Sequence, residues 1–179
     1  MQFFKSAAAE LHRTASLAGA AMMAALNLVL NQITIPVSNM LEIGFTFLAA
    51  GACGYLYGPW LAGIAGIAAD LMGYFLRPNG AFFPGFTLNE FVLGFIYGAF
   101  FYKRKITLPR TVAACCTAVL CVNLCLTPLW LYILYGKSFF ALLGVRLIKN
   151  AIKLPIDICL LHFTLKTIEK HRKPERLGT

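Results

Sequence analysis

Six apolar runs, each roughly long enough to cross a lipid bilayer, follow one another along this 179-residue chain. A transmembrane helix needs about 20 apolar residues at about 1.5 Å of rise per residue. Apolar residues make up 59% of the chain and charged residues 13%, which is more apolar surface than a soluble domain of this size can bury. The sequence therefore predicts a single all-α domain over residues 1–179, an integral membrane bundle of six transmembrane helices. The predicted spans are 14–35, 43–58, 59–76, 84–102, 111–134 and 139–165.

The positively charged side chains lie mainly on one side of this arrangement. With both termini in the cytoplasm, the outer loops hold Arg77 and Lys137, while most of the 16 Lys and Arg residues fall in inner segments. Cytoplasmic loops of membrane proteins carry such an excess of basic residues. We therefore predict a multi-pass protein of the cell (plasma) membrane with cytoplasmic termini, surrounded by lipid and without a nucleic-acid partner. The inner basic residues are Lys5, Arg13, Lys103, Arg104, Lys105, Arg110, Lys166, Lys170, Arg172, Lys173 and Arg176.

The last predicted span carries four charged residues at helical spacing. Arg146, Lys149, Lys153 and Asp157 are separated by three, four and four residues, so they lie on one stripe. A basic side chain near the bilayer centre costs about 2.5–3.5 kcal/mol to insert, so the stripe should face the bundle interior, water or a ligand. We predict an ion pair between Lys153 and Asp157, which leaves Arg146 and Lys149 without a partner on their own helix.

Two acidic residues on other predicted spans lie at a similar depth. With the topology above, Asp70 and Glu90 fall in the outer half of the membrane or near its middle, as do Arg146 and Lys149. The predicted helix that begins at Pro84 points its N-terminus, whose free N–H groups favour anions, at the same region. A structural salt-bridge cluster and a ligand pocket both account for these charges. We favour a pocket for an anionic small molecule, because ionisable residues inside a membrane are candidates for function.

Aromatic side chains surround the same zone. Trp and Tyr commonly form a belt at the membrane interface, and such a belt accounts for most of them. The FFPGF segment at 82–86 is denser than a belt requires, and it predicts a short loop that stacks on a planar ligand and closes over it. The aromatic residues of this zone are Phe45, Phe47, Tyr74, Phe82, Phe83, Phe86, Trp130 and Tyr132.

Motifs of the common catalytic and metal sites are absent from the sequence. It contains no GxxxxGK[ST] phosphate-binding loop, no HExxH zinc motif and no GxSxG nucleophile motif. The six cysteines lie in apolar runs without CxxC spacing, so we expect them to pack as small apolar residues. We predict no catalytic residue, no metal and no cofactor. A chain without internal repeats and with a one-sided pocket is expected to bind its cargo and to need partners to move it.

Small residues at helical spacing line the first predicted span. Ala21 and Ala25 lie on one stripe with Ala18, and Ala20 and Ala24 widen this stripe. Small residues let helix backbones approach one another closely in lipid. The stripe therefore serves either for packing inside the bundle or for docking another membrane subunit.

Several motifs resemble those of one transporter family. They are Gly58-Pro59, Ala69-Asp70, PNGAFFPGFTL at 78–88, GFIYG at 94–98, and RLIK at 146–149 with Pro155. Together they resemble the folate family of substrate-binding components of energy-coupling-factor (ECF) vitamin transporters, over nearly the whole chain. The resemblance implies a non-enzymatic component that captures a folate-like vitamin outside the cell. It also implies two kinds of partner, a transmembrane scaffold subunit and two ATPase subunits that supply the energy for uptake.

The resemblance further implies roles for individual residues. Folate carries a planar pterin and a glutamate with two carboxylates. Asp70 is suited to accept hydrogen bonds from pterin N–H groups, while Phe83 or Phe86 stacks on a ring. Arg146 and Lys149 are suited to meet the carboxylates. The predicted substrate-binding residues are Asp70, Tyr74, Phe83, Phe86, Asn89, Arg146 and Lys149.

In such families a stripe of small residues on the first helix meets the scaffold. Ala21 with Ala25, or Ala20 with Ala24, are therefore candidate docking positions, and internal packing remains an equal alternative. Two alternatives for the whole chain also stay open. The substrate is a different pterin-like or anionic vitamin, or the chain is a non-transport membrane assembly protein whose charges form a structural network.

Overall fold

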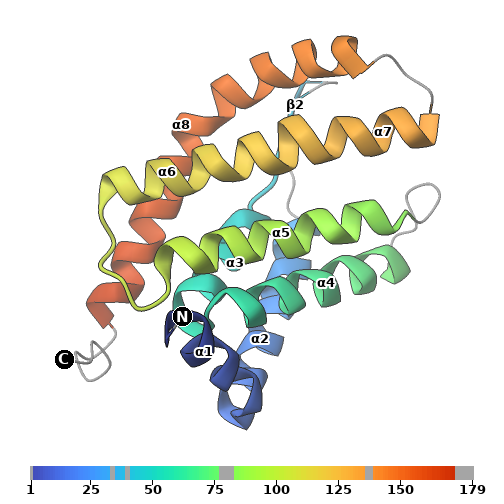
Figure 1. Cartoon of the computed structure of the whole chain (residues 1–179). Helices are drawn as coiled ribbons and strands as arrows, with labels where there is room; N and C mark the ends of the chain where they lie inside the picture. The colour runs from blue at the N-terminus through green and yellow to red at the C-terminus, as the bar shows by residue number, and fades with distance from the viewer. Residues whose placement is uncertain (1, 33–34, 39–40, 77–82, 136–138, 172–179) are drawn as a thin grey trace.

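A computed structural model describes residues 2–32, 35–38, 41–76, 83–135 and 139–171, and nearly all of these residues are helical. The long helices form one bundle, with α4 and α5 running antiparallel side by side (Figure 1). A stretch of wider π-helical turns, η2, joins α6 to α7. The elements are α1 (Gln2–Ala9), the 3-10 turn η1 (Glu10–His12), α2 (Thr14–Gln32), β1 (Ile35–Ser38), β2 (Leu41–Ile43), α3 (Thr46–Tyr57), α4 (Pro59–Leu76), α5 (Pro84–Phe101), α6 (Leu108–Ala118), η2 (Val119–Leu126), α7 (Thr127–Tyr135) and α8 (Phe139–His171).

Each predicted span overlaps a helical stretch of the structure. Pro59 and Pro84 begin α4 and α5 as expected, because proline fits the first helical turn, where its missing N–H is not needed. Among the described residues, three stretches are long and apolar enough to cross a membrane: Thr14–Gln32, Pro59–Leu76 and Leu108–Leu134. The helical membrane architecture is confirmed, whereas the count of six spans and the cytoplasmic side of the termini stay predictions.

The structure differs from the predicted spans around residues 35–43. The antiparallel strands β1 and β2 occupy this stretch, with Ile35 opposite Ile43 and Pro36 opposite Glu42. Proline lacks the N–H that a continuing helix needs, and β-branched neighbours favour an extended backbone. The first span therefore stops before the predicted residue 35, which lies in β1, and the last described residue of α2 is Gln32. Helix α3 has 12 residues, so it is about 18 Å long and does not cover the whole predicted second span.

Glycines bring the backbones of α3, α4 and α5 into direct contact. The chain turns from α3 into α4 at Gly58, whose φ of 90° is a conformation that residues with a side chain rarely adopt. A Cβ added to Gly54 would lie 2.6 Å from the backbone nitrogen of Gly98. Added Cβ atoms at Gly98 and Gly94 would collide with the backbones of Pro59 and Ala62. We call Gly54, Gly94 and Gly98 the glycine seam. It fixes α4 against α5, the two helices that carry the first part of the candidate site.

Two apolar clusters fill the bundle. One lies between α3, α5, α6 and α8, around Tyr97, Phe101 and Leu161. The other lies between α2, α3 and α4, around Ala24, Cys53 and Leu61. Large apolar side chains also stay exposed on the outer faces, as a surface surrounded by lipid requires. Examples are Met22, Val29, Met72, Phe75, Leu120 and Phe163.

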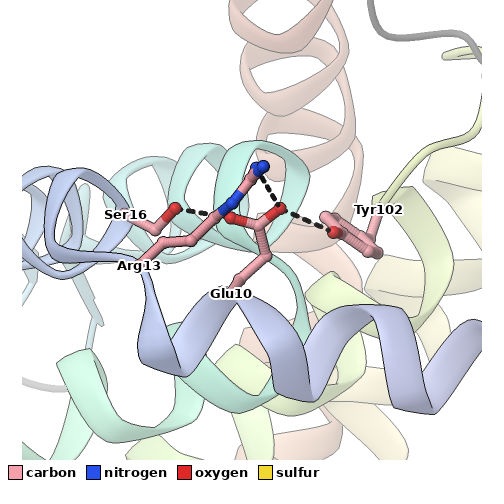
Figure 2. A network of polar contacts seen from close by, with 4 residues as sticks. All are labelled: Glu10, Arg13, Ser16 and Tyr102. Carbon is pink, nitrogen blue, oxygen red and sulfur yellow. Dashed lines mark hydrogen bonds and ion pairs between the residues drawn. The ribbon is translucent and has the colours of Figure 1, made fainter.

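A polar network closes the end of the bundle that we predict to be cytoplasmic (Figure 2). The Glu10 carboxylate is 8% exposed and accepts a short hydrogen bond from the Ser16 hydroxyl. It also accepts one from the Tyr102 hydroxyl at 3.3 Å and pairs with the Arg13 guanidinium at 3.5 Å. We call these four residues the Glu10 network. It joins η1 and the start of α2 to the residue that follows α5, and it was not predicted.

Candidate functional site

The predicted acidic residue Asp70 bridges α4 and α5. The Thr87 hydroxyl donates a hydrogen bond of 2.6 Å to the Asp70 carboxylate, and both residues are half-buried. Tyr74 lies one helical turn further along α4, so it shares a face of that helix with Asp70. Glu90 lies one turn below Thr87 on α5, with its backbone against Gly66. A half-buried carboxylate held by a hydroxyl is a suitable acceptor for N–H groups of a ligand.

Asn89 connects α5 to α7 and is almost fully buried, with 6% of its surface exposed. Its side-chain oxygen accepts a hydrogen bond of 3.0 Å from the Trp130 indole N–H. Its side-chain nitrogen donates one of 3.2 Å to the Thr127 hydroxyl. Asn89 therefore lies on the part of α5 where the substrate site was predicted, but its described polar contacts are to other side chains of the bundle.

Three aromatic rings gather at the start of α5. The Phe83 and Phe86 rings meet edge to face with centroids 6.0 Å apart, and the Phe83 and Trp130 centroids are 5.6 Å apart. Gly85 lies beneath them, because a Cβ there would approach to within 2.6 Å of the Trp130 ring. All three rings are half-buried, so part of their surface stays accessible. Such a group of rings suits a planar aromatic ligand.

The predicted ion pair on α8 is present. The Lys153 ammonium lies 3.7 Å from the Asp157 carboxylate and 5.7 Å from the centre of the Phe47 ring on α3. Arg146 and Lys149 belong to the same helix, but their side chains lie outside the described part of the chain. Phe82, within the predicted loop, also lies outside the described residues.

Known proteins resemble the chain in both sequence and fold. The family model "ECF transporter, substrate-specific component" matches residues 15–163. The chain belongs to this family. It is a non-enzymatic transport component and an integral protein of the cell membrane.

Several relatives of this ECF component carry the name folate transporter FolT. The relative from Clostridium novyi is 37% identical over 150 residues, which are 84% of this chain and 87% of the relative. Those from Leuconostoc mesenteroides and Streptococcus mutans are 31% and 30% identical, and cover 81% and 77% of this chain and 81% and 78% of their own length. A crystal structure of FolT bound with folic acid aligns with a TM-score of 0.77 and 37% identity. That alignment covers 84% of this chain and 92% of the other.

The small residues on α2 of this ECF component divide into two faces. Ala20 and Ala24 are buried, at 4% and 6% exposed, and pack against α3 and α4. Ala21 and Ala25 lie on the exposed face of the same helix. Internal packing therefore accounts for Ala20 and Ala24, and the exposed pair remains available to a partner subunit.

Sequence reasoning missed three groups of the site. Thr87 lies within the FPGFTL segment, but nothing in the sequence pairs it with Asp70. Trp130 was listed among the aromatic residues of this zone, but its contacts with Asn89 and Phe83 were not predicted, and Thr127 carried no signal of its own. The contacts of Trp130 and Thr127 are evident only once α7 is packed against α5, because their partner Asn89 lies 38 residues or more away along the chain.

Proposed function

We propose that this ECF component binds folate on the outer side of the membrane and passes it into the cell with partner subunits. The observation that carries this proposal is the likeness to FolT bound with folic acid, at 37% identity over 84% of this chain. The half-buried carboxylate of Asp70 and the rings of Phe83, Phe86 and Trp130 support it, since a pterin needs hydrogen-bond acceptors and aromatic surfaces.

Each chemical part of folate has a counterpart in the chain. Asp70 accepts hydrogen bonds from the pterin amino and ring N–H groups, while Phe83 and Phe86 pack against its plane. Arg146 and Lys149, on the outer part of α8, receive the two carboxylates of the glutamate. The free N–H groups at the start of α5 add a favourable field for negative charge.

The six-span topology with cytoplasmic termini belongs to the same proposal. It puts the Asp70 region toward the outside and the basic loop at 103–105 toward the cytoplasm, in line with the positive-inside rule. An ECF scaffold subunit then docks on the exposed face of α2 at Ala21 and Ala25, and two ATPase subunits supply the energy. Ala21→Leu should abolish co-purification with the scaffold while leaving folate binding intact. In the matched variant Ala20→Leu, overpacking of the bundle should lower stability by about 1–3 kcal/mol.

The direct test is calorimetry on the full chain solubilised in detergent. We expect folate to bind with 1:1 stoichiometry in the absence of ATP, and thiamine, an unrelated vitamin, to give no heat. A thermal-shift screen of other pterins and anionic vitamins identifies the ligand if it is not folate, because a bound ligand raises the melting temperature. Absence of binding to every vitamin tested would contradict the proposal.

The alternative of a structural charge network draws support from the Lys153–Asp157 ion pair. It expects Arg146→Ala and Asp70→Ala to lower the melting temperature without changing folate uptake by cells. Our proposal expects the reverse for Asp70, namely a loss of uptake with little change in stability.

A further inference from the structure

We infer that Asn89 does not contact the ligand but positions Trp130, whose ring forms one wall of the folate site. This inference rests on the proposed function. It changes the role that the sequence predicted for Asn89, and it adds Trp130 and Thr127 to the residues that determine binding.

The two partners of the Asn89 amide determine its orientation. An indole N–H only donates hydrogen bonds, so the amide oxygen must face Trp130 and the amide nitrogen must face Thr127. The distances are 3.0 Å and 3.2 Å. At 6% exposure, a ligand would have to displace neighbouring side chains to reach this amide. The oxygen and the nitrogen of the Asn89 amide are thus both engaged in hydrogen bonds within the protein.

Thr127 anchors this chain of hydrogen bonds to the backbone of η2. The Thr127 hydroxyl accepts from Asn89 and donates a hydrogen bond of 2.7 Å to the Val122 carbonyl. The Thr127 backbone N–H also points to that carbonyl, five residues earlier, as the wide turns of η2 require. Hydrogen bonds therefore run in one direction from Trp130 through Asn89 and Thr127 to the backbone. Segments of π-helix occur frequently at functional sites.

These contacts leave part of the Trp130 ring accessible. The Trp130 ring is held at its N–H by Asn89 and on one side by Phe83 and Gly85. Trp130 is half-buried, whereas Asn89 is buried. The ring therefore offers a surface in a fixed orientation for a flat heteroaromatic group, and Asn89 acts on the ligand only through that ring.

A double-mutant cycle on the full chain tests this inference. The single variants are Asn89→Leu, which has the same number and branching of side-chain heavy atoms but no amide, and Trp130→Phe, which keeps an aromatic ring but has no N–H. Each should weaken folate binding by about tenfold, the effect of losing about 1.4 kcal/mol. The double variant should bind no more weakly than Trp130→Phe alone, because Asn89 has no other route to the ligand.

Two results would overturn the inference. Additive effects, giving about 100-fold weaker binding in the double variant, would mean that Asn89 contacts folate independently. Unchanged folate binding by Asn89→Leu would mean that Asn89 does not position Trp130 for the ligand. If Asn89→Leu does not fold, Thr127→Val replaces it in the cycle. It removes the acceptor of the Asn89 amide at nearly constant volume, and it should weaken binding several-fold, again without adding to Trp130→Phe.

A ligand-free measurement separates this inference from the proposed function. The chain has two tryptophans, so Trp60→Phe leaves Trp130 as the sole tryptophan, whose fluorescence is excited at wavelengths that tyrosine does not absorb. In that background, Asn89→Leu should lower the fluorescence anisotropy of Trp130 and weaken its near-UV circular dichroism, because the ring loses its anchor. An unchanged spectrum overturns the inference even if folate binds. If the starting chain binds no folate but the spectrum changes, the proposed ligand is wrong and the positioning role stands.

Discussion

The Glu10 network and the candidate site are both polar groups inside an apolar bundle, yet they are built differently. Glu10, Ser16 and Tyr102 are 8%, 5% and 1% exposed, and the Glu10 carboxylate accepts from Ser16 and Tyr102 and pairs with Arg13. At the candidate site, Asp70 and the rings of Phe83 and Phe86 are only half-buried. In the Glu10 network the carboxylate and its hydroxyl partners are buried against one another, whereas the candidate site keeps polar and aromatic surfaces that a ligand can reach.

This difference separates stability from binding. A buried carboxylate that accepts hydrogen bonds from several elements of the same chain holds those elements together, since removal of the carboxylate takes the acceptor away from buried donors. A half-buried carboxylate with a single described donor has acceptor capacity left for a ligand. Substitutions in the two regions should therefore affect different measured quantities.

The largest effect is expected for Asp70→Ala. We expect folate to bind about 30- to 100-fold more weakly, because hydrogen bonds to a charged group contribute about 1.5–3 kcal/mol each. The melting temperature should change little, since the lost Thr87 contact is partly exposed. Calorimetry and thermal unfolding on the same preparation measure both quantities. A lower melting temperature with an unchanged Kd would place Asp70 in the same class as Glu10.

The next effect is expected for Glu10→Ala, with the opposite signature. It removes the carboxylate that accepts hydrogen bonds from the buried Ser16 and Tyr102 hydroxyls, so we expect a loss of about 2 kcal/mol of unfolding free energy. The Kd for folate should stay unchanged. The measurement is thermal unfolding in detergent. A weaker folate affinity would show that the two regions are coupled.

A smaller loss is expected for Tyr102→Phe. The residue, which is 1% exposed, keeps its ring in the core, and the 3.3 Å hydrogen bond to Glu10 is removed. The expected loss of stability is about 1 kcal/mol, typical of one hydrogen bond. The same unfolding assay measures it. A loss equal to that of Glu10→Ala would mean that Tyr102 is the main anchor of the network.

The smallest effect is expected for Arg13→Ala. The Arg13 side chain is 62% exposed and its ion pair with Glu10 is long at 3.5 Å, so solvent screens it. We expect a loss of at most about 0.5 kcal/mol, which disappears at high salt. Unfolding at two salt concentrations measures this difference. A larger loss that persists at high salt would mean that the network depends on charge pairing.

Much of the bundle could be predicted from the sequence because membrane helices leave long apolar runs with proline and glycine at their ends. Pro59, Pro84 and the Gly58 turn are such marks, and the predicted helices begin and end near them. The strands at 35–43 were missed because they fall almost entirely in the connection between the predicted spans 14–35 and 43–58, for which no secondary structure was predicted. The short helix α1 was missed because it is too brief to leave a span-length pattern.

The site was predictable only in part, for a physical reason. Charged residues such as Asp70 and Asp157 stand out in an apolar chain, and the Lys153–Asp157 pair follows from helical spacing alone. The Asn89–Trp130 hydrogen bond joins α5 to α7, and no periodicity within one helix contains that information. The role of Glu10 was not predicted either, since it depends on Tyr102, 92 residues away along the chain.

The glycine seam also limits how far this sequence can diverge. At Gly54, Gly94 and Gly98 an added Cβ meets neighbouring backbone, which no change of rotamer relieves, whereas at Gly73 it meets only side chains at 3.5 Å or more. In a library of single substitutions selected for vitamin uptake, we expect the seam to accept nothing larger than glycine and Gly73 to accept alanine. The positions least free to change would then be ones that contact neither vitamin nor partner.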